Sequence, residues 1–347
     1  LTAKAKLKDI RAREALLQLS IAKNDLSYGF LSDAREAITL AALTRLTESY
    51  ALRFAVVSDS ARTRYSVGRG ALADGSRASL SRGNFREQAR KLAGQRDARL
   101  AMLNYYLRPG KSDSAGSAGQ STDSATAWLT ADQGEAALQA YRARLLREIE
   151  SASRAVERSA LDVARRDLEV DAAREQRTLA RLQYLPDFEV FAAYREREMI
   201  ENDPAVGEDC YSVGLRLRVP LWSALGAGYA ADSAEQFERA GQISRSDAIE
   251  HVQAQLAALR ADFTSATERL ALYDTRLIPD ARRARESARL AYQTGRIDFF
   301  ALVSSWNALY ANESERIRLA GERDRLVFRM AALLNVLVPE YQTGAEK

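Results

Sequence analysis

A repeat within the chain constrains its fold more than any other feature of the sequence. The segments Ser60–Arg69 and Ser287–Arg296 are identical at six of ten positions, with a constant offset of 227 residues. Each copy lies between two long helical patterns and carries a glycine, Gly68 or Gly295. A glycine at the end of a helix can adopt the left-handed conformation that lets the chain reverse direction. The repeat therefore predicts two copies of one unit, each a helical hairpin with its tip at the glycine.

Long helical patterns flank both predicted tips. The first pair covers residues 2–63, with an irregularity expected at 28–30, and residues 72–107. The proline-free segments 129–184 and 223–278 are each 56 residues long, or about 84 Å of straight helix. We expect Pro279 to interrupt the last of these, and the helical pattern then continues over residues 280–292 and 298–337. Helices of this length predict an extended fold in which helices pack along each other.

The segment before Pro279 carries apolar residues at alternating spacings of three and four. This spacing is the heptad pattern of coiled coils. The positions are Ile249, Val252, Leu256, Leu259, Phe263, Ala266, Leu270, Tyr273 and Leu277. The sequence therefore predicts that the long helices pack as coiled coils.

Residues 185–222 are the only stretch whose pattern predicts β-structure. A strand rich in β-formers follows Leu185-Pro186-Asp187, a polar loop covers 196–209, and residues 211–219 alternate until Pro220. Side chains alternate across a strand, so one face of the second strand is apolar and the other polar. The apolar face holds Val213, Leu215, Leu217 and Val219, and the polar face holds Ser212, Gly214, Arg216 and Arg218.

Two structures share this alternation. A hairpin in a soluble sheet buries its apolar side, whereas a membrane β-barrel strand turns that side to lipid and its polar side to a wet lumen. The strand alone favours the soluble sheet. A lone hairpin is marginally stable, however, and such long helices leave no local sheet for it to join. The context therefore favours the barrel, with Arg216 and Arg218 facing the lumen and with Tyr211 and Trp222 at the membrane interfaces.

Composition excludes several classes of protein. The chain has 347 residues, 28% of them charged, and a net charge of only +4 from interspersed acidic and basic residues, which argues against a nucleic-acid partner. No window approaches the roughly 18 apolar residues of a membrane helix. With one cysteine, Cys210, and one histidine, His251, the chain offers no disulfide and no metal site. Without a phosphate loop or nucleophile elbow, we predict neither an enzyme nor a cofactor.

In their order and spacing, these motifs resemble the TolC-like outer-membrane efflux protein family. The resemblance rests on Leu185-Pro186-Asp187 opening a strand, on residues 211–222, and on the two Tyr-x-x-Gly tips at Tyr65/Gly68 and Tyr292/Gly295. It implies a mainly α fold with a membrane β-hairpin. Long antiparallel coiled-coil helices would form a periplasmic α-barrel, and the hairpin would supply part of a trimeric outer-membrane β-barrel.

The resemblance also implies a division of the chain. Its parts would be the first-repeat half of the helical tunnel (1–110), a low-complexity equatorial linker (111–128), a long helix (129–184), the outer-membrane hairpin (185–222), the second-repeat half with its tip near 292–298 (223–338) and a C-terminal tail (339–347). Family members have two β-hairpins per protomer. With only the two strands found here, a trimer would have six strands, fewer than the roughly eight of the smallest membrane barrels. We therefore expect an N-terminally truncated sequence whose first hairpin, signal peptide and any lipid-anchor cysteine would precede Leu1.

The function implied is that of a passive trimeric duct in the outer membrane of a Gram-negative bacterium, with most of the chain in the periplasm. It would export drugs, metal cations or other small molecules received from a periplasmic adaptor protein and an inner-membrane pump. The tip residues that would contact the adaptor are Tyr65, Gly68, Arg69, Tyr292, Gly295 and Arg296. Asp74 and Asp298 are candidates for a pore constriction; Asp74 lies six positions beyond its tip glycine, where the second copy has Ala301. The alternative is a soluble coiled-coil scaffold or adaptor with a small β docking hairpin.

Overall fold

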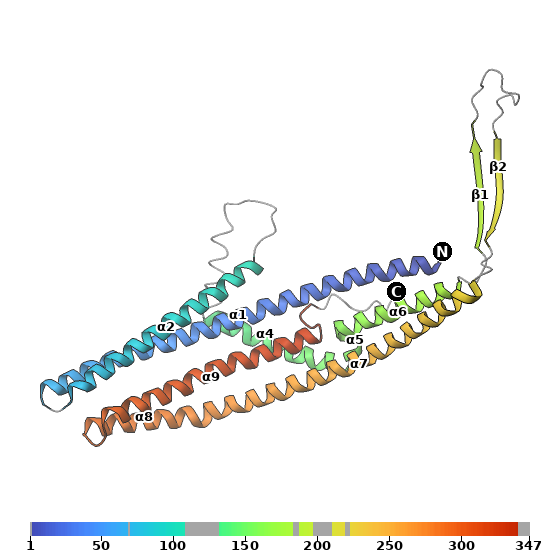
Figure 1. Cartoon of the computed structure of the whole chain (residues 1–347). Helices are drawn as coiled ribbons and strands as arrows, with labels where there is room; N and C mark the ends of the chain where they lie inside the picture. The colour runs from blue at the N-terminus through green and yellow to red at the C-terminus, as the bar shows by residue number, and fades with distance from the viewer. Residues whose placement is uncertain are drawn as a thin grey trace. The chain divides into compact units, whose positions relative to one another are not determined.

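The chain folds into long helices and one antiparallel β-hairpin, which confirms the predicted fold class (Figure 1). The computed structural model describes residues 2–68, 70–107, 132–182, 187–196, 210–218 and 223–338. The chain divides into two compact units. One comprises Leu1–Gln18 and Asp162–Glu250, and the other comprises Leu19–Leu161 and His251–Lys347. Among the described helices, none combines the length and the apolar character needed to cross a membrane.

In the two helical hairpins of the second unit, the helices begin and end at equivalent positions of the sequence repeat. The first hairpin joins the end of α1 (Thr2–Ser66) to α2 (Leu72–Tyr106), and the second joins α8 (Ile278–Gln293) to α9 (Phe299–Leu333). The differences 293 − 66, 299 − 72 and 333 − 106 all equal 227. The repeat found at the tips therefore extends over the whole length of α2 and α9.

Helix α1 is continuous, so the irregularity expected at residues 28–30 is absent. Gly29 serves packing instead, because a Cβ added there would lie 2.7 Å from the hydroxyl oxygen of Tyr106 on α2. The close approach of the two helices explains a glycine in mid-helix without any break.

The segment 129–184 differs from the single helix predicted for it. It contains α4 (Asp132–Ser153), the short α5 (Val156–Ser159) and α6 (Leu161–Leu182). The helix ends where the hydroxyl of Ser153 donates to the Glu150 carbonyl, and that of Ser159 to the Ala152 and Ala155 carbonyls. Serine side chains compete in this way with the backbone ladder of a helix. Two serines bonded to backbone carbonyls thus lie at the interruption, which contains neither proline nor glycine.

The segment around Pro279 stays helical. Helix α7 (Ser223–Leu272) passes through a π-helical turn, η1 (Tyr273–Leu277), into α8. A π-turn next to Pro279 accommodates the missing backbone donor, so the expected interruption is a change of helix type. Of the predicted heptad positions, Val252, Leu256, Leu259, Ala266 and Leu270 are buried and the other four are half-buried. The heptad pattern thus marks the packed face of these helices.

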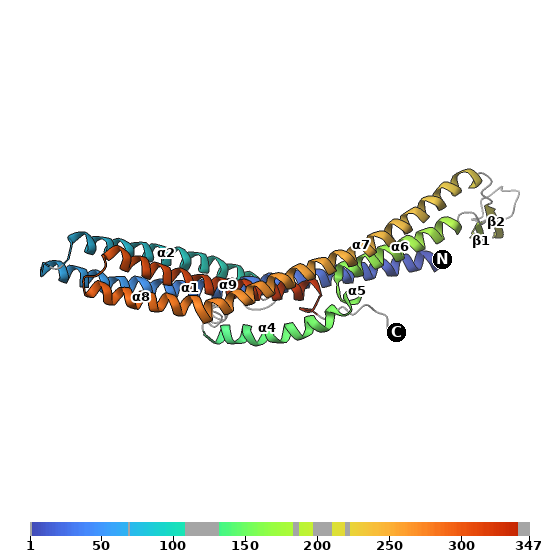
Figure 2. The same cartoon turned by 90° about the horizontal axis from the view of Figure 1, so that it is seen from below.

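An aromatic cluster joins the two hairpins, whose helices run side by side (Figures 1 and 2). Tyr50 and Phe54 of α1 and Phe85 of α2 meet Trp306 and Tyr310 of α9, with ring centroids 4.9–6.1 Å apart. The hydroxyl of Tyr50 donates to the Glu313 carboxylate at 3.0 Å. Aromatic side chains bury large apolar areas, so this cluster is a major source of stability for the paired hairpins.

A buried ionic cluster attaches α4 to the hairpins. Asp324 of α9, 1% exposed, lies 2.6 Å from Arg142 of α4 and 3.4 Å from the buried Arg35 of α1. Arg35 also donates to Glu135 of α4 at 2.5 Å. Each buried charge therefore has an opposite charge beside it, as buried ions require.

Candidate functional site: the exposed hairpin and the helical tips

The hairpin consists of β1 (Asp187–Arg195) and β2 (Cys210–Arg218), each nine residues long and paired in antiparallel register. Val190 lies opposite Leu215, and Ala192 lies opposite Val213. Residues directly opposite each other share a face of the sheet. The register therefore extends the apolar face predicted for β2 onto β1.

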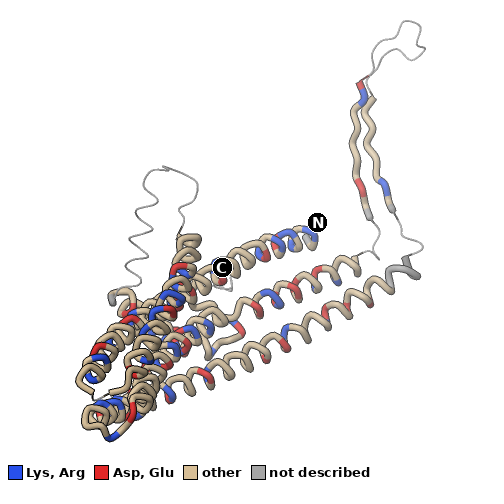
Figure 3. Tube along the Cα trace, turned by 60° about the vertical axis from the view of Figure 1, so that its left-hand side comes forward, with Lys and Arg blue, Asp and Glu red and all other residues tan. Residues whose placement is uncertain are grey.

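This apolar face is exposed along the described part of both strands. It consists of Phe188, Val190, Ala192, Tyr194, Tyr211, Val213, Leu215 and Leu217. Val213 is 81% exposed and Val190 is 76% exposed. The middle of both strands carries no charged residue, whereas the helices carry mixed charges along their length (Figure 3). Contiguous exposed apolar surface of this kind marks a site of contact with a membrane or another protein.

The opposite face of the hairpin is polar around one aromatic ring. Arg216 donates to Glu189 at 3.1 Å, and its guanidinium lies 5.5 Å from the centroid of the Phe191 ring. Gly214 leaves room for that ring, since a Cβ there would lie 2.5 Å from Phe191 Cζ. The side chain of Arg218 and the whole of Val219 lie outside the described residues, so their predicted orientations remain predictions.

The hairpin has no further strand within the described part of the chain, where β1 and β2 pair only with each other. Both outer edges thus present unpaired backbone donors and acceptors. An open edge beside an apolar face is a template for pairing with further strands. Nine residues is also the length of a strand that crosses a bilayer at a tilt, about 9–11 residues.

The two tips have the same backbone geometry. Gly68 has φ 72° and Gly295 has φ 74°. The amide of Gly68 donates to the Tyr65 carbonyl at 2.9 Å, and that of Gly295 donates to the Tyr292 carbonyl at 3.1 Å. Both glycines therefore hold the left-handed conformation that the repeat predicts. Arg296 is exposed at its tip, and Arg69 lies outside the described residues.

A contact that the sequence did not suggest joins the two tips. Arg64 Nη1 donates to the Tyr292 carbonyl at 2.6 Å, and its guanidinium lies 4.5 Å from the centroid of the Tyr292 ring. Burial, followed by the charge of the nearby Asp74 carboxylate, raises the pKa of Tyr292. Arg64, Asp74 and Tyr292 thus form a tip latch between the first and second hairpins.

The two residues predicted to constrict a pore have different surroundings. Asp74 takes part in the tip latch, whereas Asp298 caps α9 by accepting from the Ala301 amide at 2.8 Å. Ala71, the N-cap of α2, makes no such side-chain bond. A constriction at either carboxylate remains a prediction. Among the described residues, no group of three or more His, Cys, Asp or Glu side chains could hold a metal ion.

Comparison with known proteins gives matches to solved structures only. No family model matches the chain, and no curated protein sequence does. The outer membrane protein VceC of Vibrio cholerae superimposes with a TM-score of 0.76 at 15% identity, covering 96% of this chain and 75% of VceC. CusC gives a TM-score of 0.78 at 12% identity over 96% of this chain and 73% of CusC.

The MtrE outer membrane channel of Neisseria gonorrhoeae, solved in an open state, gives a TM-score of 0.71 at 11% identity, covering 96% of this chain and 71% of MtrE. At identities this low, the structural matches establish the fold alone. The hairpin, the helices and the tips are therefore parts of one known architecture, and the chain has the TolC-like fold of outer-membrane channels.

Proposed function

We propose that this chain is a subunit of a passive trimeric duct that carries solutes across the periplasm and the outer membrane. The observation that carries the proposal is the exposed apolar face of an isolated hairpin. A face with Val213 at 81% and Val190 at 76% exposure is unfavourable in water. Lipid is the environment that accepts it, provided that other strands close the hairpin's edges.

Closure of a barrel supplies those strands. Every backbone donor and acceptor must be satisfied within a bilayer, which only helices and closed barrels achieve. The exposed apolar face makes the hairpin the part that would enter the membrane. Hairpins from several copies would turn Val213, Leu215 and Leu217 to lipid and Arg216 to a water-filled lumen. Arg216 paired with Glu189 suits that wet side.

The helical hairpins would form the periplasmic tunnel, with their tips directed at a periplasmic adaptor and inner-membrane pump. Tyr65, Gly68, Arg69, Tyr292, Gly295 and Arg296 are the proposed adaptor contacts. The chain would carry out no chemistry, and the pump would supply the energy. Opening would separate the tips, because the tip latch is the polar contact that holds the two hairpins together there.

Cell fractionation tests the membrane assignment against the soluble scaffold. A barrel subunit should stay in the outer-membrane pellet through high salt and alkaline carbonate, because its contact with lipid is apolar. Release of the full-length protein by either wash would favour the scaffold and contradict the duct.

Tyr292→Phe should loosen the closed tip. The substitution keeps the ring under Arg64 but removes the hydroxyl on which the Asp74 carboxylate acts. Loss of one such polar contact with a charged group costs about 1–2 kcal/mol in each protomer, which shifts an open–closed equilibrium roughly 5–30-fold. The measurement is the open probability of single channels in planar bilayers.

Tyr65→Phe is the matched control, because Tyr65 holds the equivalent place in the first tip and is 49% exposed. It should leave the open probability unchanged. Equal effects of the two substitutions would show that the tip latch does not hold the channel closed.

A further inference from the structure

The contact between the two hairpins covers only one side of each. Helix α9 turns Leu302, Trp306 and Tyr310 toward the first hairpin, where Trp306 lies 5.8 Å from Tyr50 and 6.1 Å from Phe54 between ring centroids. The hydroxyls of Tyr310 and Thr47 also form a hydrogen bond of 2.9 Å. This face of α9 is therefore the second hairpin's contribution to the contact.

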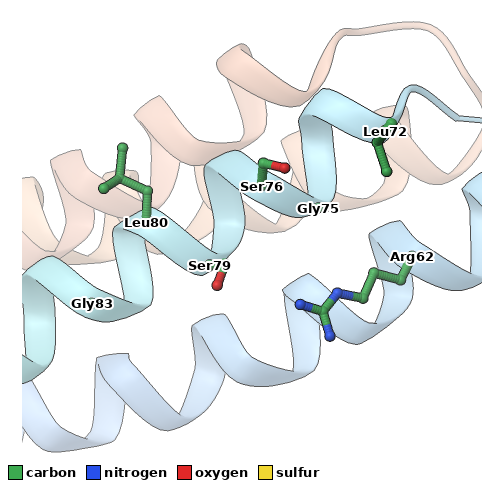
Figure 4. A pocket seen from close by; sticks show the side chains of 7 residues that line it. All are labelled: Arg62, Leu72, Gly75, Ser76, Ser79, Leu80 and Gly83. Carbon is green, nitrogen blue, oxygen red and sulfur yellow. The ribbon is translucent and has the colours of Figure 1, made fainter.

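The equivalent face of α2, 227 residues earlier, is open beyond its first residue, Gly75, which is buried and where an added Cβ would lie 3.2 Å from Arg62 Cγ of α1. Gly75, Ser79 and Gly83 stand where α9 has Leu302, Trp306 and Tyr310. Ser79 and Gly83 are exposed, and a Cβ added at Gly83 would meet nothing within 4 Å. Together with Arg62, Leu72, Ser76 and Leu80 they line an open groove of about 570 Å³ (Figure 4). We call it the α2 groove.

The equivalent face of the second hairpin is lined mostly by alanines. Ala281 and Ala288 are half-buried against the aromatic cluster, and Ala284 is exposed. The residues equivalent to Tyr50 and Phe54 are Leu277 and Ala281, and those equivalent to Val57, Ala61 and Arg64 are Ala284, Ala288 and Ala291. Of the bulky aromatic residues of the contact within the chain, Tyr50 is thus replaced by a leucine, and Phe54, Trp306 and Tyr310 are replaced by alanine, serine and glycine. Small side chains let two helices approach to about 8 Å, the lower end of the usual range.

We infer that the α2 groove receives the alanine face of α8, residues Ala281, Ala284, Ala288 and Ala291, from a second copy of this chain. The inference rests on the proposed ring of protomers, in which first and second hairpins alternate. In such a ring the uncovered side of one hairpin must meet the uncovered side of the next. The internal repeat supplies the geometry, and the matched small residues supply the fit.

The same equivalence describes the tip between copies. Tyr65 takes the place of Tyr292, and Ala291 and Ala301 take the places of Arg64 and Asp74. The contact between copies therefore lacks the polar groups of the tip latch. The two kinds of joint in the ring differ: one is aromatic and latched, and the other is close and apolar.

Ser79→Trp tests the groove by restoring the bulk that α9 has at Trp306. The added ring should hold the copies apart and raise the dissociation constant of the trimer at least tenfold, measured by sedimentation of the full-length protein in detergent. Asn84→Trp is the matched control, because Asn84 is exposed on α2 about 140° around the helix from Ser79. An unchanged trimer in both variants would overturn the inference.

A cross-linking experiment separates this inference from the proposed function. In a Cys210→Ser background, Ser79→Cys with Ala281→Cys should give covalent dimers and trimers with a short bis-maleimide, and Asn84→Cys with Ala281→Cys should give none. A trimer by native mass spectrometry without cross-links from the first pair would overturn the inference and leave the duct standing. A monomer in every preparation would overturn both.

Discussion

Leu215→Arg should prevent assembly of the membrane barrel. Leu215 lies in the middle of the apolar face, 67% exposed and opposite Val190. An arginine facing lipid near the bilayer midplane costs about 2–4 kcal/mol, and a trimer would carry that cost three times. We expect the trimer to fall below detection on native gels of detergent extracts of the outer membrane.

Two controls on the same strand separate lipid contact from general disruption. Ser212→Arg introduces the same charge on the polar face, and Arg216→Ala removes one there. Both should assemble as the unsubstituted protein does, with at most a change in conductance. Normal assembly of Leu215→Arg, or equal failure of Ser212→Arg, would show that the apolar face does not contact lipid.

Phe54→Ala should have the largest effect on the stability of the helical hairpins. Phe54 is fully buried, with ring centroids 5.3 Å from Phe85 and 6.1 Å from Trp306. Replacing a buried phenylalanine by alanine removes apolar contacts and leaves a cavity, at a cost of about 3–5 kcal/mol. Urea unfolding followed by circular dichroism measures the loss as a lower midpoint.

Leu52→Ala is the control for this substitution. Leu52 lies two residues away on α1 but is 67% exposed, so its truncation should change the free energy of unfolding by less than about 0.5 kcal/mol. Equal midpoints for the two variants would contradict the placement of the hydrophobic core between the hairpins.

The parts predictable from sequence were those that repeat or alternate. The offset of 227 residues located both tips, and the helix ends keep that offset. The alternation of apolar and polar residues in β2 predicted its apolar face. The same alternation in β1, at Phe188, Val190, Ala192 and Tyr194, would have extended that face to both strands. The spacing of apolar residues follows from the local geometry of a helix or a strand. It therefore predicts where helices and strands lie and which of their faces are apolar.

The parts that sequence reasoning missed depend on packing between distant segments or on weak local signals. The tip latch joins Arg64 to Tyr292 across the two repeats, and no local pattern marks Arg64 as its donor. The break between α4 and α6 contains neither proline nor glycine, and serines are common within helices. Asp298 was predicted only as a constriction residue, although an aspartate directly before a helix is a common N-cap, and the structure shows its capping bond to the Ala301 amide.

Conductance tests the central claim most directly. The full-length protein, purified as a trimer and reconstituted in planar lipid bilayers, should open a water-filled pore of constant unit conductance, and Tyr292→Phe should open it more often. A folded trimer that passes no current, in either form and at any applied voltage, would contradict the account of this chain as an export duct.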